Sequence, residues 1–533
     1  YRDHLQTFVY ASGTTMKPIF ATAKAASAKR VAYSEGEEER VLRAAGFADT
    51  VRACRNLRGL AGAGARRQFA RLALLACDVL RALPDPDMAL NNWERFSGCV
   101  EEPGAHFAQL LAQPVRLEIL MAIFAGSQFL AETLMQTPGL FAWITTPDTV
   151  QRPRARDELE RELRAQAAHA PDADAWRAAI RRTRRREILR IGTRDLWLRV
   201  PLEETVRELA ELADAIVAVA FDQCWSRVRT TLSAWPDCDD PARHCCVMAF
   251  GKLGGAELNY SSDIDLLGLS DDGAFNVIRR NGRVWTHKEL YARLLEELRR
   301  DLADTTADGI AYRVDYRLRP HGGAGDRTPS VSAALDYYRA HARPWELQAA
   351  LKLRPIAGNR HIGAYFLTML RPLLARPRDR REVVDSIKHL RRTAVRKTAA
   401  GLAAGIDVKN GAGGIRDIEF AVQGLQLIHA HARPELLEAN TLAALAALRD
   451  AGIIAPAAAR QLHDDYCFLR RIEHFLQILE DQQLHAVPVE GAALTALARR
   501  VGNAATTSDE FLTQLRAAMQ RVATLSADLL QTA

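Results

Sequence analysis

The stretch FGKLGGAELNYSSDIDLLGLSDD, residues 250–272, combines glycines, a Ser-Ser pair and two aspartates within an apolar run. Side chains at alternate positions of a β-strand point to the same face, so Asp263 and Asp265 are expected to lie together while Ile264 and Leu266 face the core. Two carboxylates so close repel each other and are costly to bury without a counter-charge. Mg²⁺ prefers oxygen ligands and commonly takes one or two carboxylates together with substrate phosphates. The pair therefore predicts a divalent-cation site.

A third acid and two arginines follow in the segment RVDYRLRP, residues 313–320. Asp315 again stands among apolar residues, and Arg317 and Arg319 follow it at same-face spacing. A third acid on another strand can complete a two-metal site for in-line displacement at phosphorus. An arginine can bind two phosphate oxygens in a bidentate manner. We therefore interpret the three aspartates as metal ligands and catalytic residues. An isolated D-x-D more often lies on a solvated edge strand or loop; the flanking glycines and serines favour the site.

The residues around these acids carry groups that bind phosphate. Glycines let backbone N–H groups approach a phosphate closely, and serine hydroxyls add further donors. Another glycine-rich run, GGIRDIEF at residues 413–420, opens an apolar helix, where an arginine at the N-terminus can face a phosphate. An acidic helix cap is an equally good interpretation of that run. The candidate nucleotide- or phosphate-binding residues are Lys252, Gly254, Gly255, Ser261, Ser262, Arg317, Arg319 and Arg416.

The segment that holds the acids predicts the elements that must position them. Residues 245–250, CCVMAF, form a short apolar run ended by glycine, which predicts a buried strand. Residues 263–270 predict a second strand, residues 287–304 an amphipathic helix, and residues 311–320 a third strand closed by Pro and a glycine-rich turn. This order predicts a small α/β unit.

The segments on both sides of this unit have helical periodicity. Residues 65–83 and 201–225 place apolar residues at helical spacing, and residues 438–452 and 462–483 do the same. We therefore predict an α+β fold that is mostly helical, with a small mixed β-sheet between helical regions. The predicted domains are an N-terminal helical region over residues 1–185, a catalytic domain with leading helices over 186–360, and a C-terminal helical bundle over 361–533.

Composition limits the classes of partner. A chain of 533 residues predicts two to four domains, and its mild net charge of +7 does not require a nucleic acid. No apolar run of about 18 residues and no signal-peptide pattern are present, so we predict no membrane contact and a cytoplasmic location. The eight cysteines lack metal-binding spacing and predict free thiols in a reducing compartment. The first residue is Tyr1 rather than Met, which suggests a piece of a longer protein.

Three further features have a structural and a functional interpretation. The basic run at residues 181–194 predicts a solvated helical face, with a docking surface for an acidic partner as the alternative. Lys352 and Arg354 are expected on a helix, where a buried ion pair and a phosphate contact are equally good interpretations. His474 and His485 are expected to be structural histidines with satisfied hydrogen bonds.

Several motifs resemble the glutamine synthetase adenylyltransferase/adenylyl-removing family, within the nucleotidyltransferase superfamily of the DNA polymerase β type. The superfamily pattern of a glycine pair, a D-x-D and a later acid is represented by residues 253–255, residues 263–265 and Asp315. The family resemblance runs from about residue 189 to 488. It rests on GKLGGAELNYSSDIDL, TADGIAYRVDYRLRPHGGAG, PWELQAALKLRPIAGN, VKNGAGGIRDIEFAVQGLQL and YCFLRRIEHFLQILEDQQLHAVP.

The resemblance implies an activity and its partners. The family's enzymes have two nucleotidyltransferase halves: one attaches AMP from ATP to a tyrosine of glutamine synthetase, and the other removes it by phosphorolysis, releasing ADP. GGIRDIEFAVQ is similar to the removing half, whereas PWELQAALKLR, with Gln348, is similar to the adenylylating half. The resemblance implies Mg²⁺ or Mn²⁺ on the three aspartates, in-line attack of phosphate on tyrosyl-AMP, and control of nitrogen assimilation. It also implies the signalling protein PII as a further partner.

Three alternatives to AMP removal remain open. The same site can run the opposite reaction and attach AMP from ATP. A module without activity that binds glutamine synthetase or PII is a second alternative, against which the three intact aspartates argue. A nucleic-acid polymerase of the same superfamily is the weakest, because the chain has no basic groove with interleaved aromatic residues for a template.

Overall fold

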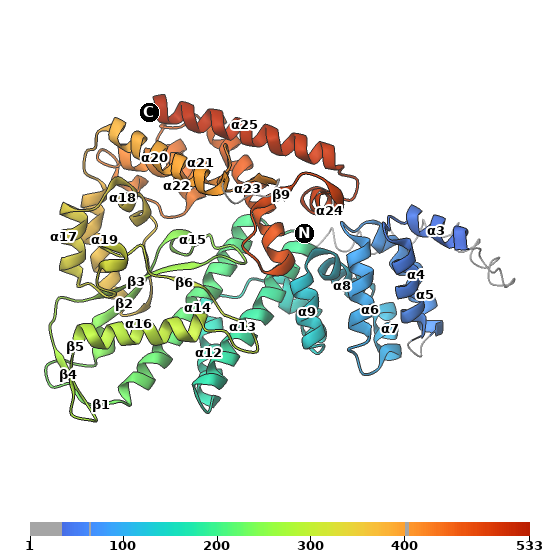
Figure 1. Cartoon of the computed structure of the whole chain (residues 1–533), viewed down its shortest axis with the longest axis horizontal. Coiled ribbons are helices and arrows are strands. Elements are labelled where there is room, and N and C mark those ends of the chain that lie inside the picture. Colours follow the sequence, from blue (N-terminus) through green and yellow to red (C-terminus); the bar gives the residue numbers. More distant parts are fainter. Residues whose placement is uncertain (1–34, 63–65, 400–404, 533) are drawn as a thin grey trace.

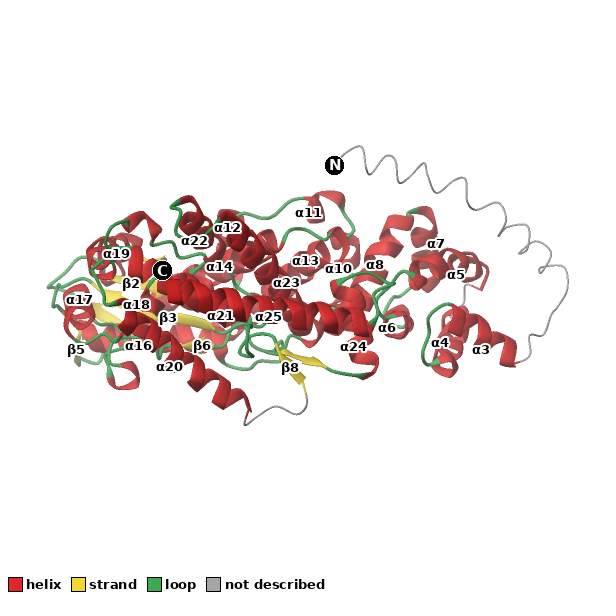
Figure 2. Cartoon of the chain, turned by 90° about the horizontal axis from the view of Figure 1, so that it is seen from above, coloured by secondary structure: helices red, strands yellow, loops and turns green. Residues whose placement is uncertain are grey.

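The computed structural model describes residues 35–62, 66–399 and 405–532. These residues are mostly helical and contain three small β-sheets (Figures 1 and 2). The predicted class, a mostly helical α+β fold with a small mixed sheet between helical regions, is confirmed. The prediction about a signal peptide concerns N-terminal residues that lie outside those described.

The first helices pack around an aromatic core and lie at the right of Figure 1. The ring centroid of Phe69 lies 5.8 Å from that of Trp93 and 5.5 Å from that of Phe107, distances typical of stabilising aromatic pairs. These helices are α3 (Glu35–Ala44), α4 (Thr50–Gly62), α5 (Arg66–Arg81), α6 (Pro86–Ser97), α7 (Pro103–Ala112) and α8 (Pro114–Gly126). They are followed along the chain by α9 (Gln128–Gln136), α10 (Leu140–Ile144), α11 (Pro147–Gln151) and α12 (Arg156–His169).

Two long helices lead from this block to the central sheet. They are α13 (Ala173–Thr193) and α14 (Leu202–Arg229), with one π-helical turn over Arg194–Leu198 between them. Helix α14 follows Pro201 and carries acids in its first turn, which suit the positive end of the helix dipole. Helix α13 continues without a break through residues 185 and 186. The division into three domains stays a prediction.

The central sheet has four strands in the order β6-β3-β2-β7. Strand β2 is antiparallel to β3 and to β7, whereas β3 and β6 are parallel, so the sheet is mixed. The predicted strands over residues 245–250 and 263–270 and the predicted helix over 287–304 are confirmed. The elements are β2 (Cys245–Ala249), β3 (Ile264–Ser270), β6 (Val314–Asp315), β7 (Arg354–Gly358) and α16 (His287–Ala303).

Alternate residues of β2 enter two different cores, because side chains of a strand alternate between its faces. Cys245 and Val247 join the larger core with residues of α14 and α16. Cys246 and Met248 join a second core with residues of α17 (Val331–Ala340) and α19 (Arg360–Leu374). The sheet is therefore covered by helices on both faces, and its polar residues are left at the strand ends.

The third strand predicted over residues 311–320 is correct only for Val314–Asp315. The chain turns directly after it, and Arg319 fixes the turn by donating to three backbone carbonyls, those of Tyr316, Gly323 and Gly325, at 2.8–3.0 Å. The guanidinium of Arg319 is thus used within its own loop.

The helix expected at Lys352 and Arg354 is wrong. Helix α18 (Pro344–Ala350) ends before Lys352, and Arg354 is the first residue of β7. Strand β7 is short and contains Pro355, so it has no alternating pattern that predicts a strand.

Two further small sheets were not predicted, because their strands have only three or four residues. Strand β4 (Asn276–Arg279) pairs with β1 (Leu232–Ala234) and β5 (Val284–Thr286), and β8 (Gly405–Asp407) pairs with β9 (Ala486–Pro488). The remaining helices are α20 (Arg380–Ala399), α21 (Ile415–His429), α22 (Thr441–Asp450), α23 (Pro456–Glu480), α24 (Gly491–Val501) and α25 (Ser508–Thr532).

Among the described residues, no single helix combines the length and the apolar character needed to cross a membrane. Helices α7 and α8 meet those two criteria only as a pair, and the chain bends by 112° between them.

The basic run at residues 181–194 holds a buried ion network, so its prediction as a solvated face is wrong. Arg190 and Arg194 of this run are buried, and both pair with Glu208 of α14, with N–O distances of 2.6 and 2.8 Å. Helix α14 packs against α13 and adds Glu208 to the counter-charge of Glu187, which lies within the run and pairs with Arg190 at 2.8 Å.

We predict that Glu208→Ala destabilises the protein by about 3–5 kcal/mol, because it removes a buried carboxylate that two buried guanidinium groups share and leaves each of them with a single remaining acid, Glu187 or Glu204. Asp336→Ala is the matched control: Asp336 is exposed and pairs with Arg339 on the surface of α17, where an ion pair contributes at most about 1 kcal/mol. Chemical denaturation of both variants measures the difference. Equal small effects would contradict the buried network.

Candidate active site

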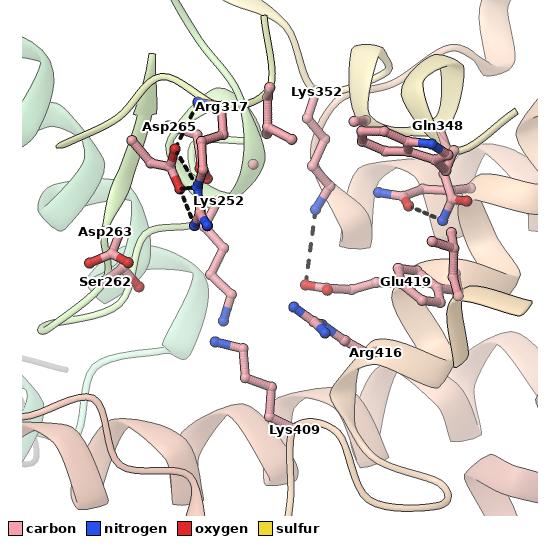
Figure 3. Close-up of a pocket in the computed structure, with 18 of the residues that line it drawn as sticks. Lys252, Ser262, Asp263, Asp265, Arg317, Gln348, Lys352, Lys409, Arg416 and Glu419 are labelled. Carbon is pink, nitrogen blue, oxygen red and sulfur yellow. Dashed lines mark hydrogen bonds and ion pairs between the residues drawn. The ribbon is translucent and has the colours of Figure 1, made fainter. Parts of the chain in front are cut away.

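A cleft of about 610 Å³ lies between the central sheet and the C-terminal helices (Figure 3). Its lining comes from the ends of β3 and β6, from the short helix α15 (Gly251–Gly254), from α18 and from α21. All three predicted metal ligands line this cleft, and we refer to Asp263, Asp265 and Asp315 as the acidic triad.

Strand pairing brings the acidic triad together. Strands β3 and β6 are parallel, and Asp265 stands directly opposite Asp315 in their register. Asp263 precedes β3 by one residue and, two positions before Asp265, lines the same cleft. The triad therefore depends on the only parallel strand pair of the described sheets.

The carboxylates of the triad have different electrostatic environments. Burial, together with the negative charges of Asp315 and Asp263, raises the pKa of Asp265 to about 6. Although burial alone would raise the pKa of Asp315, hydrogen bonds from Arg317 lower it. Asp263 is more exposed and accepts a hydrogen bond of 2.5 Å from Arg313. One carboxylate of the triad is therefore short of positive charge, and the other two are held by arginines.

Gly251 permits the close approach of α15 to the triad, a role that the sequence analysis missed. Its φ of +58° lies in the left-handed region, and a Cβ at this position would come within 2.7 Å of Asp265 Oδ2. A side chain here would displace the most buried carboxylate of the acidic triad. The glycine run in the sequence gave a signal, but it did not indicate which glycine faces the acids.

Gly254 and Gly255, two of the candidate phosphate-binding residues, lie outside the lining of the cleft. A Cβ on Gly254 would come within 1.8 Å of the carbonyl oxygen of Lys352, and one on Gly255 within 3.0 Å of that of Ala439. Both glycines serve close backbone packing behind the cleft instead of presenting N–H groups to a ligand.

Two other candidates are also engaged elsewhere. The hydroxyl of Ser261 is directed away from the cleft and donates to the carbonyl oxygen of Asp481 at 2.8 Å. Arg319 holds its own turn, as described above, and does not line the cleft. Ser262, Arg317, Lys252 and Arg416 do line it.

Positively charged side chains face the acidic triad across the cleft. Lys252 and Lys409 both pair with the buried Glu473 of α23, with N–O distances of 3.0 and 3.3 Å, and Figure 3 shows their ammonium groups close together. Arg416, from the first turn of α21, also lines the cleft; its backbone N–H donates to the carbonyl oxygen of Lys409 at 3.1 Å, and its guanidinium has no hydrogen-bond or ion-pair partner among the described residues. We refer to Lys252, Lys409 and Arg416 as the cationic cluster.

Lys252 of this cluster and its partner Glu473 form a buried pair, and the pKa values of both are shifted. Burial, followed by the nearby charge of Arg470, lowers the pKa of Lys252 to about 7 despite its contact with Glu473. Although burial would raise the pKa of Glu473, the charges of Lys252 and Lys409 hold it well below its ordinary value. The ammonium form of Lys252 is therefore less favoured than that of a lysine in water, and an additional anion beside it would favour that form.

Lys352 has a structural contact and also lines the cleft. It is buried and forms an ion pair with Glu257, and its Nζ donates to Thr441 Oγ1 at 3.1 Å. Glu419 of α21 lies 4.0 Å from Lys352 Nζ (Figure 3). Of the two interpretations for Lys352, the structure supports the buried ion pair. Arg354 likewise pairs with Asp214, at 2.5 Å.

The two predicted structural histidines differ in environment. His474 is buried, with Nε2 2.8 Å from Asn259 Oδ1, so its expected structural role is confirmed. His485 lines the cleft, and its Nε2 lies 3.6 Å from Asp407 Oδ2.

Comparison with known protein families agrees with this geometry. A family model described as glutamate-ammonia ligase adenylyltransferase matches residues 117–369, which include the central sheet and the acidic triad. This part of the chain belongs to the glutamate-ammonia ligase adenylyltransferase family. A second model, described as GlnD PII-uridylyltransferase, matches residues 385–530, which include Lys409 and Arg416. The family resemblance inferred from the motifs is confirmed.

Curated relatives carry the same family name. Proteins named bifunctional glutamine synthetase adenylyltransferase/adenylyl-removing enzyme are 34% identical in Pseudomonas putida, over 70% of this chain, and 34% in Streptomyces coelicolor, over 83%. The protein of that name in Pseudomonas aeruginosa is 35% identical over 72% of this chain. The alignments cover 38%, 42% and 39% of these relatives, so the chain spans about two fifths of their length.

The donor set of the acidic triad fits a hard divalent cation. Three carboxylates without a nitrogen or sulfur donor suit Mg²⁺ or Mn²⁺, and the raised pKa of Asp265 indicates a charge deficit that a cation relieves. The three carboxylates do not all lie within 4.8 Å of one another in the described structure. Arg313 and Arg317 hold the two outer ones, and both contacts must loosen for a shared ion.

We predict that Asp265→Asn stabilises the metal-free protein at neutral pH. The folded-state pKa of about 6 lies above the ordinary 3.8, so the folded state binds more protons and the free energy of unfolding falls as pH rises through that interval. Thermal unfolding of wild type and variant should therefore diverge between pH 3.8 and 6.

Saturating Mg²⁺ should reduce that difference, because it stabilises only the wild-type carboxylate. Asp336→Asn, an exposed surface change, serves as the control and should follow wild type at every pH. Parallel curves for wild type and Asp265→Asn would contradict the electrostatic description of the triad.

Proposed function

We propose that this chain removes AMP from adenylylated glutamine synthetase by metal-dependent phosphorolysis, giving glutamine synthetase and ADP, and so regulates nitrogen assimilation. The observation that carries the proposal is the arrangement of the cleft, in which the acidic triad faces the cationic cluster. Such a pairing suits a reaction in which inorganic phosphate attacks the phosphorus of a phosphodiester and the tyrosine oxygen leaves. The motif GGIRDIEFAVQ, which supplies Arg416, favours removal over attachment.

In this proposal the triad and the cluster divide the work. Asp263, Asp265 and Asp315 would hold Mg²⁺ or Mn²⁺, which supplies charge stabilisation at the phosphorus when bound. The cationic cluster holds the incoming phosphate, and Arg317 is free to bind an anionic oxygen once it leaves Asp315. Ser262 adds a hydroxyl at the edge of the cleft. The protein thus contributes positioning and electrostatic stabilisation, as phosphoryl transfer requires.

The side of the cleft formed by α18 and α21 suits a nucleobase. Trp345 and Phe420 supply aromatic walls, and the buried amides of Gln348 and Gln423 are joined by a hydrogen bond of 2.7 Å. Apolar walls with a few fixed polar groups are typical of small-molecule pockets. We assign the adenine of AMP to this side.

The partners and the location are part of the same proposal. Glutamine synthetase is the protein substrate, because the relatives are named for it. The match of residues 385–530 to a PII-uridylyltransferase model supports PII as a regulatory partner of the C-terminal helices. Regulation of this kind takes place in the cytoplasm, where we place the protein.

A second candidate is attachment of AMP from ATP to glutamine synthetase. One observation favours it: Gln348, from the motif PWELQAALKLR that resembles the adenylylating half, lines the cleft. The same acidic triad and metal serve both directions, so the site geometry does not separate them.

We expect purified protein to release ADP from adenylylated glutamine synthetase when phosphate and Mg²⁺ are supplied. Asp265→Asn should lower the rate by at least about 100-fold, the usual effect of removing a preorganised electrostatic group, whereas Asp336→Asn should not change it. Incorporation of AMP from ATP into unmodified glutamine synthetase, without ADP release, would select the second candidate. If neither ADP release nor AMP incorporation is detected, the result supports the module without activity.

We further predict that the affinity for phosphate falls as pH rises above about 7, because Lys252 then loses its proton. Lys252→Arg keeps the positive charge and should flatten this dependence, while Lys252→Met should weaken phosphate binding at every pH. The KM for phosphate, measured from pH 6 to 9 for the three proteins, tests this. An unchanged pH profile in Lys252→Arg would remove Lys252 from the phosphate site.

A further inference from the structure

Glu203, His463 and Cys467 form a cluster of potential ligands outside the cleft, where α14 meets α23. One ligand atom from each residue lies within 4.8 Å of the other two. His463 and Cys467 are four residues apart on α23 and share one helix face, and Glu203 comes from the first turn of α14. In the described part of the chain, no other group of three His, Cys, Asp or Glu residues meets this distance.

The donor atoms of this cluster select the class of ion. An imidazole nitrogen, a thiol sulfur and a carboxylate oxygen are the three kinds of ligand that Zn²⁺ takes. Mg²⁺ and Ca²⁺ prefer sites made only of oxygen atoms, so this cluster differs chemically from the acidic triad.

A neighbouring acid orients the histidine. His463 Nδ1 lies 3.2 Å from Asp464 Oδ1, and His463 Nε2 points to Glu203, 3.4 Å from its Oε1. Metal-binding histidines usually donate their second ring N–H to a carboxylate, which fixes the tautomer and leaves the other nitrogen for the metal. Asp464 therefore prepares Nε2 of His463 as the ligand atom.

The cluster also has room for a further ligand. All three residues line a cavity of about 720 Å³, which Arg471, Asn503 and Gln514 help to form. Zinc sites with three protein ligands keep a fourth position for water or a small molecule.

We propose that Glu203, His463 and Cys467 bind Zn²⁺ and thereby clamp α14 to α23. The consequence reaches the cleft, because Glu473 lies six residues after Cys467, about 9 Å along the same helix. Glu473 receives both lysines of the cationic cluster. A bound ion fixes the helix that carries their shared counter-charge.

The test is metal titration of the full chain after chelator treatment, with Co²⁺ as the spectroscopic probe and Zn²⁺ as competitor. We expect one equivalent of Co²⁺ with a sulfur-to-cobalt charge-transfer band, displaced by Zn²⁺. Cys467→Ser should lose the band, and His463→Gln should bind at least tenfold more weakly. Asp464→Asn should lower the affinity about tenfold. Cys99→Ser, which changes an exposed cysteine that does not line the cavity of the cluster, is the matched control and should keep the band.

Each contrary outcome overturns the proposal. The band would persist in Cys467→Ser if another thiol were the ligand. Another contrary outcome is that wild type binds Co²⁺ without a sulfur-to-cobalt band. If that binding were lost in Asp265→Asn, the ion would lie on the acidic triad. Circular dichroism identifies a variant that does not fold, and the remaining ligand variants then decide the result. Absence of Co²⁺ and Zn²⁺ binding by wild type would exclude the site.

Discussion

The repulsion between carboxylates on two adjacent parallel strands is the constraint on which this structure depends. Asp265 and Asp315 stand opposite each other in the register of β3 and β6, and Asp263 adds a third charge at the same strand end. An arrangement of this kind is unfavourable unless positive charge compensates it. Arginines compensate the two outer acids, whereas the buried Asp265 keeps a raised pKa. The site is thus prepared for a cation.

A second set of buried charges connects the sheet to the C-terminal helices. Lys252 follows β2, Lys409 follows β8, and both meet Glu473 of α23 at the floor of the cleft. Asn259 donates to the same carboxylate, at 2.5 Å, so the loop before β3 is tied to α23 as well. Buried ion pairs of this kind contribute little net stability but are costly to break, so they fix how the parts join. The cleft is therefore a product of both regions that the two family models match.

The sequence predicted the elements whose local pattern is complete. Strand β2 has a continuous apolar run, β3 has an apolar run interrupted by Asp265, and α16 has a clear amphipathic period. The D-x-D and the later Asp315 gave the acidic triad. Lys409 and Glu473 were missed because each lies in an ordinary helical or loop context, and only the fold brings them together. Gly254, Gly255, Ser261 and Arg319 have residue types suited to phosphate, yet backbone packing and local hydrogen bonds occupy them. The buried Arg190 and Arg194 show the same limit, since their shared partner Glu208 lies on another helix.

The central claim is that the acidic triad binds a divalent cation that acts on phosphorus. Anomalous scattering from crystals grown with Mn²⁺ and ADP tests it most directly, because Mn²⁺ can be located without a structural assumption. We predict a peak coordinated by Asp263, Asp265 and Asp315, with Arg317 released from Asp315 and the ADP phosphates facing Lys252 and Lys409. A cleft that binds ADP without Mn²⁺, with Arg313 and Arg317 still on their carboxylates, would contradict the account.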